Sequence, residues 1–216
     1  MTNASDGDVK ASMIVTLKTK GIGQDEIDDW YDLEHIPERI ALPGFVSAER
    51  WTVEGDSPFS LTLYDVTTLD VLTSAPYLAI TGDNKSPWTC RVFPRTERNR
   101  YEAVITLDKR KPGREKAEGL LVVGMNVEPA MEAEFNRWYD EEHVPNLFAI
   151  PGVLGARRYE ARAGGQKHIA MYHLTAPEVQ ASPAWKTAID TPWGSKVRPH
   201  TSDRVRFVCR RYHRKA

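Results

Sequence analysis

Several short stretches of this 216-residue chain alternate apolar and polar residues with the period of a β-strand. The clearest is FSLTLYDV at residues 59–66, where Leu61 and Leu63 fall on one face and Thr62 and Tyr64 on the other. Between such stretches, apolar residues recur every three or four positions, which is the period of an amphipathic helix. The pattern therefore predicts a mixed fold in which short strands are separated by helices.

The pattern is present twice, because the phrase WYDLEHIPERIALPG at residues 30–44 recurs as WYDEEHVPNLFAIPG at residues 138–152. The displacement of 108 positions also relates the neighbouring apolar runs, and it slips by three residues late in each copy. A repeat of this length is a domain rather than a solenoid unit. We therefore predict two homologous halves, residues 10–107 and 118–213, joined by a charged, Pro-Gly-containing linker at residues 108–117.

Each half predicts the element order strand, helix, strand, strand, helix, strand. The predicted strands are 12–19, 45–53, 59–66 and 101–107, then 120–127, 153–161, 169–174 and 205–212; the predicted helices are 25–35, 68–80, 129–143 and 177–189. This βαββαβ order gives an antiparallel sheet with both helices on one face. Because the other face needs a cover, we expect the two sheets to pack face to face. The predicted fold class is α+β, with tandem duplicated ferredoxin-like units forming an intramolecular dimeric α+β barrel.

A histidine stands at the end of the predicted first helix in each half, and a proline follows two residues later. Proline disfavours helical conformation at the residue before it, so each helix is expected to end near its histidine. The free carbonyls of a last turn and the acids Glu34 and Glu142 would favour imidazolium, and these acids could orient one ring nitrogen. We therefore expect His35 and His143 to act as general acid or base, with Glu34 and Glu142 as catalytic partners.

Aromatic residues near these histidines are candidates for substrate contact. They form pairs related by the repeat: Trp30 and Trp138, Tyr31 and Tyr139, Tyr64 and Tyr172, Trp88 and Trp193. Such side chains combine apolar area with one hydrogen-bonding atom, which suits a small oxygenated aromatic ligand. The same residues are also typical of an ordinary hydrophobic core, and a histidine near a helix C-terminus can act only as a cap of the helix. Spacing alone leaves both interpretations open.

The charge balance narrows the choice of partners. With 29 Lys and Arg against 30 Asp and Glu, no net field draws the chain to nucleic acid or to an anionic membrane. No apolar run approaches the roughly 18 residues that span a bilayer, and the polar start does not resemble a signal peptide. We therefore expect a cytoplasmic protein with a small-molecule substrate, either a monomer with an internal pseudo-dimer or a weak homodimer.

Metal and nucleotide chemistry has little support in the sequence. Cys90 and Cys209 are far apart and belong to no Cys/His cluster. Asp32, Glu34 and His35 are too close along a helix to face a single ion together. The motifs of dinucleotide sites, phosphate loops, serine hydrolases and zinc peptidases are missing from the sequence. We therefore predict neither a metal site nor a cofactor.

The repeated phrase resembles the EthD-like branch of the dimeric α+β barrel superfamily, whose motif is aromatic-Tyr-x-x-x-His-x-Pro followed by Pro-Gly. The matching residues are Trp30, Tyr31, His35, Pro37, Pro43 and Gly44, and again Trp138, Tyr139, His143, Pro145, Pro151 and Gly152. The resemblance covers both halves and implies a site between the first helix and the sheet. Members of that superfamily usually form the barrel by homodimerisation, whereas this chain carries two copies.

The resemblance implies three kinds of function. The first is a cofactor-independent lyase, isomerase, dehydratase or cyclase that uses histidine acid/base catalysis on a small apolar oxygenated or aromatic substrate of aromatic or secondary metabolism. The second is a haem-binding or oxygen-using enzyme of the monooxygenase-like type. The third is a protein that binds a small molecule without turnover. The first is our leading hypothesis, with one or both halves active.

Overall fold

The computed structural model describes residues 9–53 and 58–214. The chain divides into two compact units. Unit 1 contains the described residues up to Val104 together with Arg162–Gly164 and the end of the chain from Tyr212, and unit 2 contains the remainder. The predicted domain limits stay a prediction, although the predicted linker is not all loop, because strand pairing continues into it through Arg110.

Unit 1 is built on four antiparallel strands. They are β1 (Ala11–Thr19), β2 (Phe45–Val53), β3 (Phe59–Val66) and β4 (Thr96–Arg110). The strand order is β4-β1-β3-β2, with Ile14 of β1 opposite Leu63 of β3 and Tyr101 of β4. This is the order that a βαββαβ chain adopts when its helices lie on one face of the sheet.

Unit 2 repeats the arrangement with β5 (Gly119–Val127), β6 (Val153–Ala163), β7 (His168–Leu174) and β8 (Thr201–Arg211). Its strand order is β8-β5-β7-β6. Across the whole chain the strands follow one another as β1-β3-β2-β8-β5-β7-β6-β4 and close a barrel. The predicted fold class, an α+β barrel of tandem ferredoxin-like units, is confirmed.

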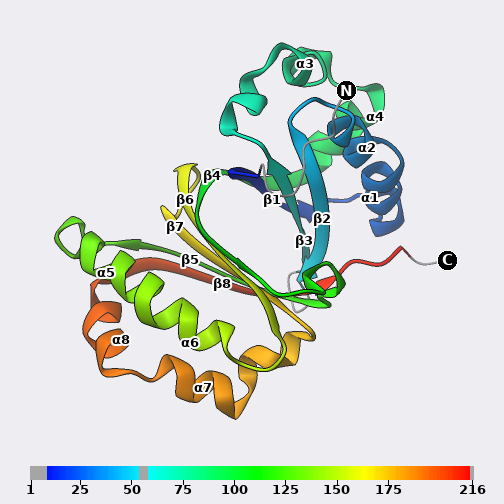
Figure 1. The fold of residues 1–216 in the computed structure, drawn as a ribbon. Coiled ribbons are helices and arrows are strands. Elements are labelled where there is room, and N and C mark those ends of the chain that lie inside the picture. The colour runs from blue at the N-terminus through cyan, green and yellow to red at the C-terminus, as the bar shows by residue number, and fades with distance from the viewer. Residues whose placement is uncertain (1–8, 54–57, 215–216) are drawn as a thin grey trace. The chain divides into compact units, whose positions relative to one another are not determined.

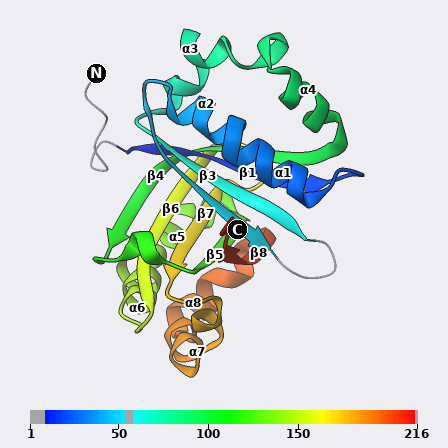
Figure 2. The ribbon, with the colours of Figure 1, turned by 90° about the vertical axis from the view of Figure 1, so that its right-hand side faces the viewer.

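The helices of each unit lie on one face of its sheet (Figures 1 and 2). In unit 1 they are α1 (Gln24–Trp30), a π turn (Tyr31–His35), α2 (Ile36–Ile40), α3 (Ala75–Leu78) and α4 (Pro87–Val92), with short 3-10 turns at Leu69–Thr73, Gly82–Asn84 and Phe93–Arg95. In unit 2 they are α5 (Glu132–Trp138), a π turn (Tyr139–His143), α6 (Val144–Phe148), α7 (Pro183–Ile189) and α8 (Pro192–Val197). Further 3-10 turns lie at Arg114–Lys116, Pro129–Met131, Pro177–Ala181 and Arg198–His200.

The first helix of each unit does not end at its histidine, which corrects the sequence-based expectation. It widens into a π turn, in which the N–H of Ile36 donates to the carbonyl of Tyr31 five residues back, and then continues as α2. Pro37 lacks an N–H and would clash with the carbonyl four residues earlier in a regular helix. The wider turn removes that conflict, so the helix passes the proline. The second copy is built the same way, with Val144 bonded to Tyr139.

The helices end at Ile40 and Phe148, and a Pro-Gly turn follows each of them. Gly44 and Gly152 have φ of +89° and +91°, a conformation that L side chains rarely adopt. A Cβ on Gly44 would lie 2.4 Å from Cγ2 of Val71, so both backbone shape and close packing require glycine here. The turn leads directly into β2 or β6, so the strands start where the sequence predicted.

Two short helices, α4 and α8, lie outside the helices predicted from the sequence. Ser86 caps α4 by accepting the N–H of Thr89, and Thr191 caps α8 by accepting the N–H of Gly194. In each case proline stands at the first helical position, where its missing N–H costs nothing. The sequences SPW at residues 86–88 and TPW at residues 191–193 are therefore helix-start signals, and the predicted helices did not include them.

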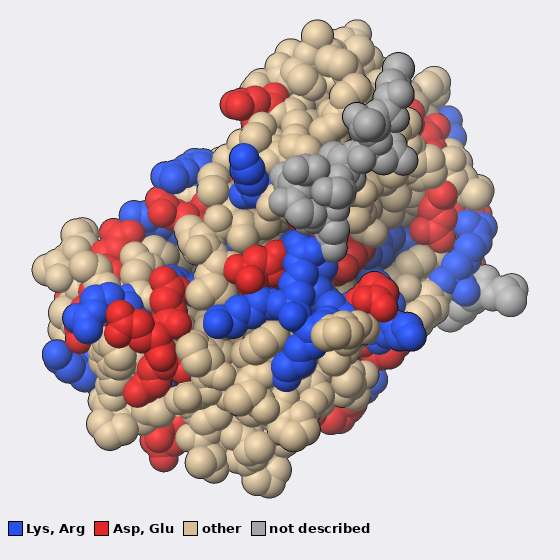
Figure 3. Space-filling model, viewed as in Figure 1, with Lys and Arg blue, Asp and Glu red and all other residues tan. Residues whose placement is uncertain are grey.

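Apolar residues of the first helix pack onto the sheet in both units. Ile27 and Phe135 are fully buried, as their spacing along the helix predicts. On the face shown in Figure 3, Lys and Arg side chains are interspersed with Asp and Glu. Within the described residues, no helix has both the length and the apolar character to cross a membrane.

Candidate functional site

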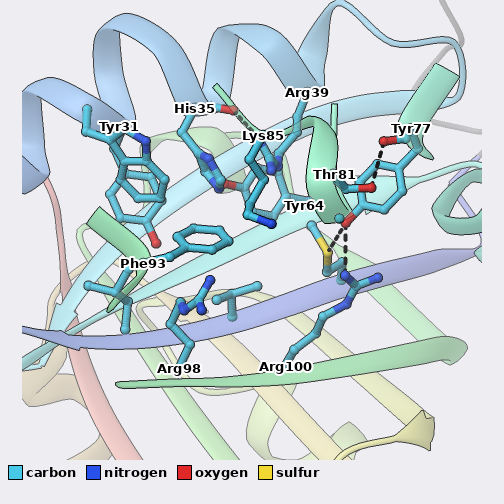
Figure 4. Close-up of a pocket in the computed structure, with 15 residues that line it drawn as sticks. Tyr31, His35, Arg39, Tyr64, Tyr77, Thr81, Lys85, Phe93, Arg98 and Arg100 are labelled. Carbon is cyan, nitrogen blue, oxygen red and sulfur yellow. Dashed lines mark hydrogen bonds between the residues drawn. The ribbon is translucent and has the colours of Figure 1, made fainter. Parts of the chain in front are cut away.

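Each unit holds a cavity between its first helix and its sheet. Cavity 1, in unit 1, has a volume of about 350 Å³, and cavity 2, in unit 2, about 140 Å³. The π turn forms the upper wall of cavity 1 and β1 and β4 form its floor (Figure 4). Cavity 1 has the size of a small-molecule site, although near the lower end of the usual range.

His35 comes from the π turn and faces cavity 1 (Figure 4). Its ring lies 3.9 Å from the Trp30 ring between centroids, and the residue is only 7% exposed. Among the described residues, no hydrogen bond reaches either ring nitrogen, and Nδ1 is fully buried. The imidazole is thus held by packing, while its hydrogen-bonding capacity is left for a ligand.

The charge state of His35 is the opposite of what the sequence suggested. Burial, followed by the nearby guanidinium groups of Arg39 and Arg98, lowers the pKa of His35 well below 6.5. Because the helix continues past the histidine, no free carbonyls of a helix end favour imidazolium. The His35 carbonyl instead accepts a hydrogen bond from Arg39. His35 is therefore neutral at pH 7.

Glu34 and Glu142 do not orient the histidines, which corrects their predicted role. Glu34 accepts a 2.5 Å hydrogen bond from the hydroxyl of Ser86, the cap of α4. Glu142 accepts 2.6 Å and 3.1 Å bonds from Thr191, the cap of α8, and from the Trp138 indole. Each glutamate therefore ties the π turn to the start of α4 or α8, and neither lines the cavity itself.

Tyr31 and Tyr64, two of the predicted substrate contacts, line cavity 1, and their contact with a substrate stays a prediction. The Tyr64 hydroxyl is buried, and no described residue offers it a hydrogen-bond partner. Burial raises the pKa of Tyr64 well above 10 and also raises the pKa of Tyr31. Both phenols therefore stay protonated at neutral pH and remain able to donate a hydrogen bond.

Cationic side chains make up the part of cavity 1 that sequence reasoning missed. Arg98 and Arg100 rise from β4, and Lys85 reaches in from the opposite side (Figure 4). Arg100 pairs with Glu102 at 2.6 Å, whereas Arg98 lies over the Phe93 ring and, like Lys85, has no ion pair with a described residue. No carboxylate is among the described residues that line this cavity. The cavity therefore favours an anionic ligand or a ligand that becomes anionic.

Cavity 2 repeats the arrangement of cavity 1 with the corresponding residues of unit 2. Tyr139, His143 and Tyr172 take the places of Tyr31, His35 and Tyr64, and Trp138 stacks on His143 at 4.5 Å. Val15 lies opposite Arg100, and its repeat partner Val123 lies opposite Arg206, so the arginines of β8 also correspond to those of β4. The register between β5 and β8 then shifts between Gly124 and Asn126, at a β-bulge beside Asp203, whose φ is +52°.

Of the four predicted tryptophan contacts, two line a cavity and two do not. Trp30 and Trp138 line cavities 1 and 2, but Trp88 and Trp193 line neither. Trp88 packs against the cluster around Ile27. The Trp193 indole donates a 3.0 Å hydrogen bond to Glu134 on α5. These two tryptophans hold α4 and α8 against the first helix of their units.

His143 makes the stability of the fold depend on pH. Burial, then Arg198, Arg158 and Arg204, lowers its pKa to about 3. Below pH 6.5 this histidine binds a proton in the unfolded chain, whereas in the folded protein it does so only near pH 3. The contribution of His143 to the free energy of unfolding is therefore complete above pH 6.5 and falls as the pH drops toward 3.

We expect His143→Gln to flatten the pH dependence of the free energy of unfolding. The wild-type curve should be steeper by about 1.4 kcal/mol per pH unit between pH 6 and pH 4. Urea unfolding at several pH values measures this difference. Equal slopes for His143→Gln and the wild type would show that His143 protonates freely in the folded state.

Similarity to known proteins is confined to the fold. No family model matches the sequence, and no curated protein matches it significantly. An anthrone oxidase-like protein has a TM-score of 0.65 at 11% identity, over 94% of this chain and 92% of that chain. A mutant chlorite dismutase from Candidatus Nitrospira defluvii, in complex with cyanide, has a TM-score of 0.65 at 9% identity, over 97% and 92%.

A monooxygenase-like protein from Listeria innocua has a TM-score of 0.53 at 9% identity, over 96% of both chains. These matches extend over nearly the whole length of each partner. At such low identity they carry information about architecture only. The chain therefore has the fold of the dimeric α+β barrel proteins, with both halves of the barrel in one polypeptide.

Proposed function

We propose that cavity 1 is the active site of a cofactor-independent enzyme that moves a proton on a small, oxygenated aromatic substrate. The observation that carries the proposal is a neutral, buried His35 with no hydrogen bond on either ring nitrogen, beside the unpartnered hydroxyl of Tyr64. A neutral imidazole with a free nitrogen is the usual general base at pH 7. The EthD-like motif supports the same assignment. Membership of the EthD-like branch is part of this proposal.

The chemistry is the removal of a proton from a carbon attached to the conjugated system of a carbonyl, either directly beside the carbonyl or across an aromatic ring from it. His35 takes the proton, and the electron pair of the C–H bond moves to the carbonyl oxygen, which becomes an enolate. Tyr64 donates a hydrogen bond to that oxygen, and Arg98 and Lys85 supply positive charge nearby. Returning the proton to another position gives an isomerisation, whereas loss of a leaving group from the enolate gives a lyase or dehydratase step.

The charges of cavity 1 favour the transition state over the substrate. Burial, followed by the charges of Arg39 and Arg98, makes protonation of His35 unfavourable, as its lowered pKa shows. The developing enolate offsets this repulsion, because it places a negative charge among the cations at the moment the imidazolium forms. Groups that stabilise charge only as it develops accelerate the chemical step rather than only tightening binding.

The walls of cavity 1 support a flat, apolar substrate body. Trp30, Tyr31, Tyr77 and Phe93 present rings to it, and Met13 of β1 lies on its floor. Aromatic side chains stack on planar ligands at little entropic cost. A ligand with one ionisable oxygen and fused or single rings matches this combination of rings and cations.

Anthrone is a suitable probe, because its methylene is acidified by a conjugated ketone and an anthrone oxidase-like protein shares this fold. Under nitrogen in D₂O, we expect the protein to speed deuterium exchange at that methylene above the buffer rate, followed by proton NMR. Binding of anthrone without faster exchange would overturn the proposal in favour of a carrier.

Admitting oxygen to the same sample distinguishes an oxygen-using reaction. Anthrone and O₂ would then give anthraquinone and water, with the enolate as the electron donor and O₂ as the oxidant. Faster anthraquinone formation together with exchange under nitrogen assigns proton removal as the first step. Formation of anthraquinone without exchange under nitrogen would refute His35-dependent proton transfer.

Haem, the cofactor of our second hypothesis, does not fit the described residues. Cavity 1 offers about 350 Å³ and cavity 2 about 140 Å³, too little for a porphyrin with its side chains. The Trp30 ring also covers one side of the His35 imidazole. A Soret band in the purified protein would contradict this assessment.

A further inference from the structure

Cavity 2 is more than a smaller copy of cavity 1, because a cation has replaced an aromatic ring. Phe93 begins the 3-10 turn after α4, and Arg198 begins the matching turn after α8. The centroid of the Phe93 ring lies 5.9 Å from that of the Trp30 ring. Cζ of the Arg198 guanidinium lies 5.9 Å from the centroid of the Trp138 ring. The substitution therefore brings a positive charge to the place where cavity 1 has a ring.

Two buried polar groups at cavity 2 have no partner among the described residues. The Nη2 atom of Arg198 is buried without a hydrogen bond, and so is the hydroxyl of Tyr172, whose residue is 1% exposed. Leaving such groups unsatisfied costs free energy, most of all for a charged group. Both residues line the cavity, so a bound acceptor that reaches these two atoms would satisfy them.

Further positive charge reaches cavity 2 from its rim. Arg204 and Lys186 line it and form no ion pair with a described residue, and Arg206 is bonded to the uncharged amide of Gln180. No carboxylate is found among the described lining residues. His143 is neutral at pH 7 and adds no charge of its own. The electrostatic environment thus selects an anion.

Size and wall chemistry define the anion further. About 140 Å³ is the room of a few water molecules, at roughly 30 Å³ each, and it is well below the volume of cavity 1. Leu121, Val123 and Met125 form an apolar wall. A planar guanidinium matches the two oxygens of a carboxylate, and the apolar wall suits a short hydrocarbon body.

We propose that cavity 2 is a separate binding site for a compact carboxylate, in which Arg198 pairs with the carboxylate and Tyr172 donates a hydrogen bond to it. The ligand that suits this site is a monocarboxylate with a single ring or a short hydrocarbon chain. It uses residues of unit 2 alone, so it does not depend on the function proposed for cavity 1.

Methionine methyl NMR tests this proposal with one reporter for each cavity. Met125 lines cavity 2 and Met13 lines cavity 1. In protein labelled with ¹³C at the methionine methyl groups, titration with sodium benzoate at pH 7 should shift the Met125 signal to saturation. Arg198→Gln and Tyr172→Phe should each raise the midpoint of that shift at least tenfold.

The controls follow the internal repeat. Tyr64→Phe, the counterpart of Tyr172→Phe, should leave the Met125 titration at its wild-type midpoint. Tyr172→Phe removes only an oxygen atom, so its effect is readable even if Arg198→Gln disturbs the fold, which circular dichroism checks. An unchanged midpoint in Tyr172→Phe, or a Met125 signal that does not respond to benzoate, would overturn the proposal. Inorganic phosphate acting as well as benzoate would overturn the assignment to carboxylates.

Discussion

Replacing His35 with glutamine is expected to lower protein-dependent deuterium exchange into anthrone by roughly 10²–10⁴-fold, the usual contribution of a general base. Glutamine approximates the length of histidine and can keep a contact with Trp30, but its amide cannot accept a proton at neutral pH. The measurement is the exchange rate under nitrogen at saturating probe. Binding of anthrone, followed separately, should change much less than the rate.

The chain contains its own matched control for this experiment. His143→Gln makes the same change in the corresponding π turn, yet cavity 2 has less than half the volume of cavity 1. Exchange should therefore remain near the wild-type rate in His143→Gln. Wild-type exchange in His35→Gln would refute the role of His35, and loss of exchange in His143→Gln alone would move the active site to unit 2.

The second large effect is expected at Arg50, which lies behind the π turn of unit 1. Arg50 is buried and binds Asp28 at 2.6 Å and Asp32 at 3.0 Å. Its guanidinium also lies 4.4 Å from the Tyr31 ring and 3.7 Å from the Tyr212 ring. One side chain therefore joins β2, the first helix and the end of the chain.

Arg50→Leu should lower the free energy of unfolding by about 3–5 kcal/mol, because the partly buried Asp28 and Asp32 lose their buried guanidinium partner. Asp28 then keeps a hydrogen bond from Gln24, and Asp32 keeps its contacts with the Tyr212 hydroxyl and the exposed Arg214. Urea unfolding measures the loss. The exposed Arg91 on α4 gives the control, since Arg91→Leu should change stability by less than about 0.5 kcal/mol. If the lost ion pairs are the cause, adding Asp28→Asn and Asp32→Asn to Arg50→Leu should recover part of the stability. An Arg50→Leu protein as stable as the wild type would contradict this account.

The fold was largely predictable, because strand and helix periods are local properties of the sequence. The run FSLTLYDV at residues 59–66 became β3 with its predicted limits. The end of the first helix was not predictable from the proline alone. A π turn depends on the whole helix accommodating Pro37, and the rule for the residue before proline describes a regular helix.

The candidate site was predicted only in part, since its two sides have different origins. His35 and Tyr31 stand in the repeated phrase and could be placed by helical spacing. Arg98 and Arg100 lie in TERNRYEA, which reads as a solvated strand end, and only the pairing of β4 with β1 brings them under the helix. The predicted role of the glutamates was wrong for a related reason, because their hydroxyl partners, Ser86 and Thr191, lie more than 45 residues away in the sequence.

The internal repeat also determines how freely the two cavities can diverge. In a symmetric homodimer one codon specifies the same side chain in both subunits, so every substitution is made twice. Here Phe93 and Arg198 are encoded separately, as are Arg39 and Leu147. A mutation that adapts one cavity to a new ligand leaves the other intact, and gene duplication followed by fusion thus allows two specificities within a single barrel.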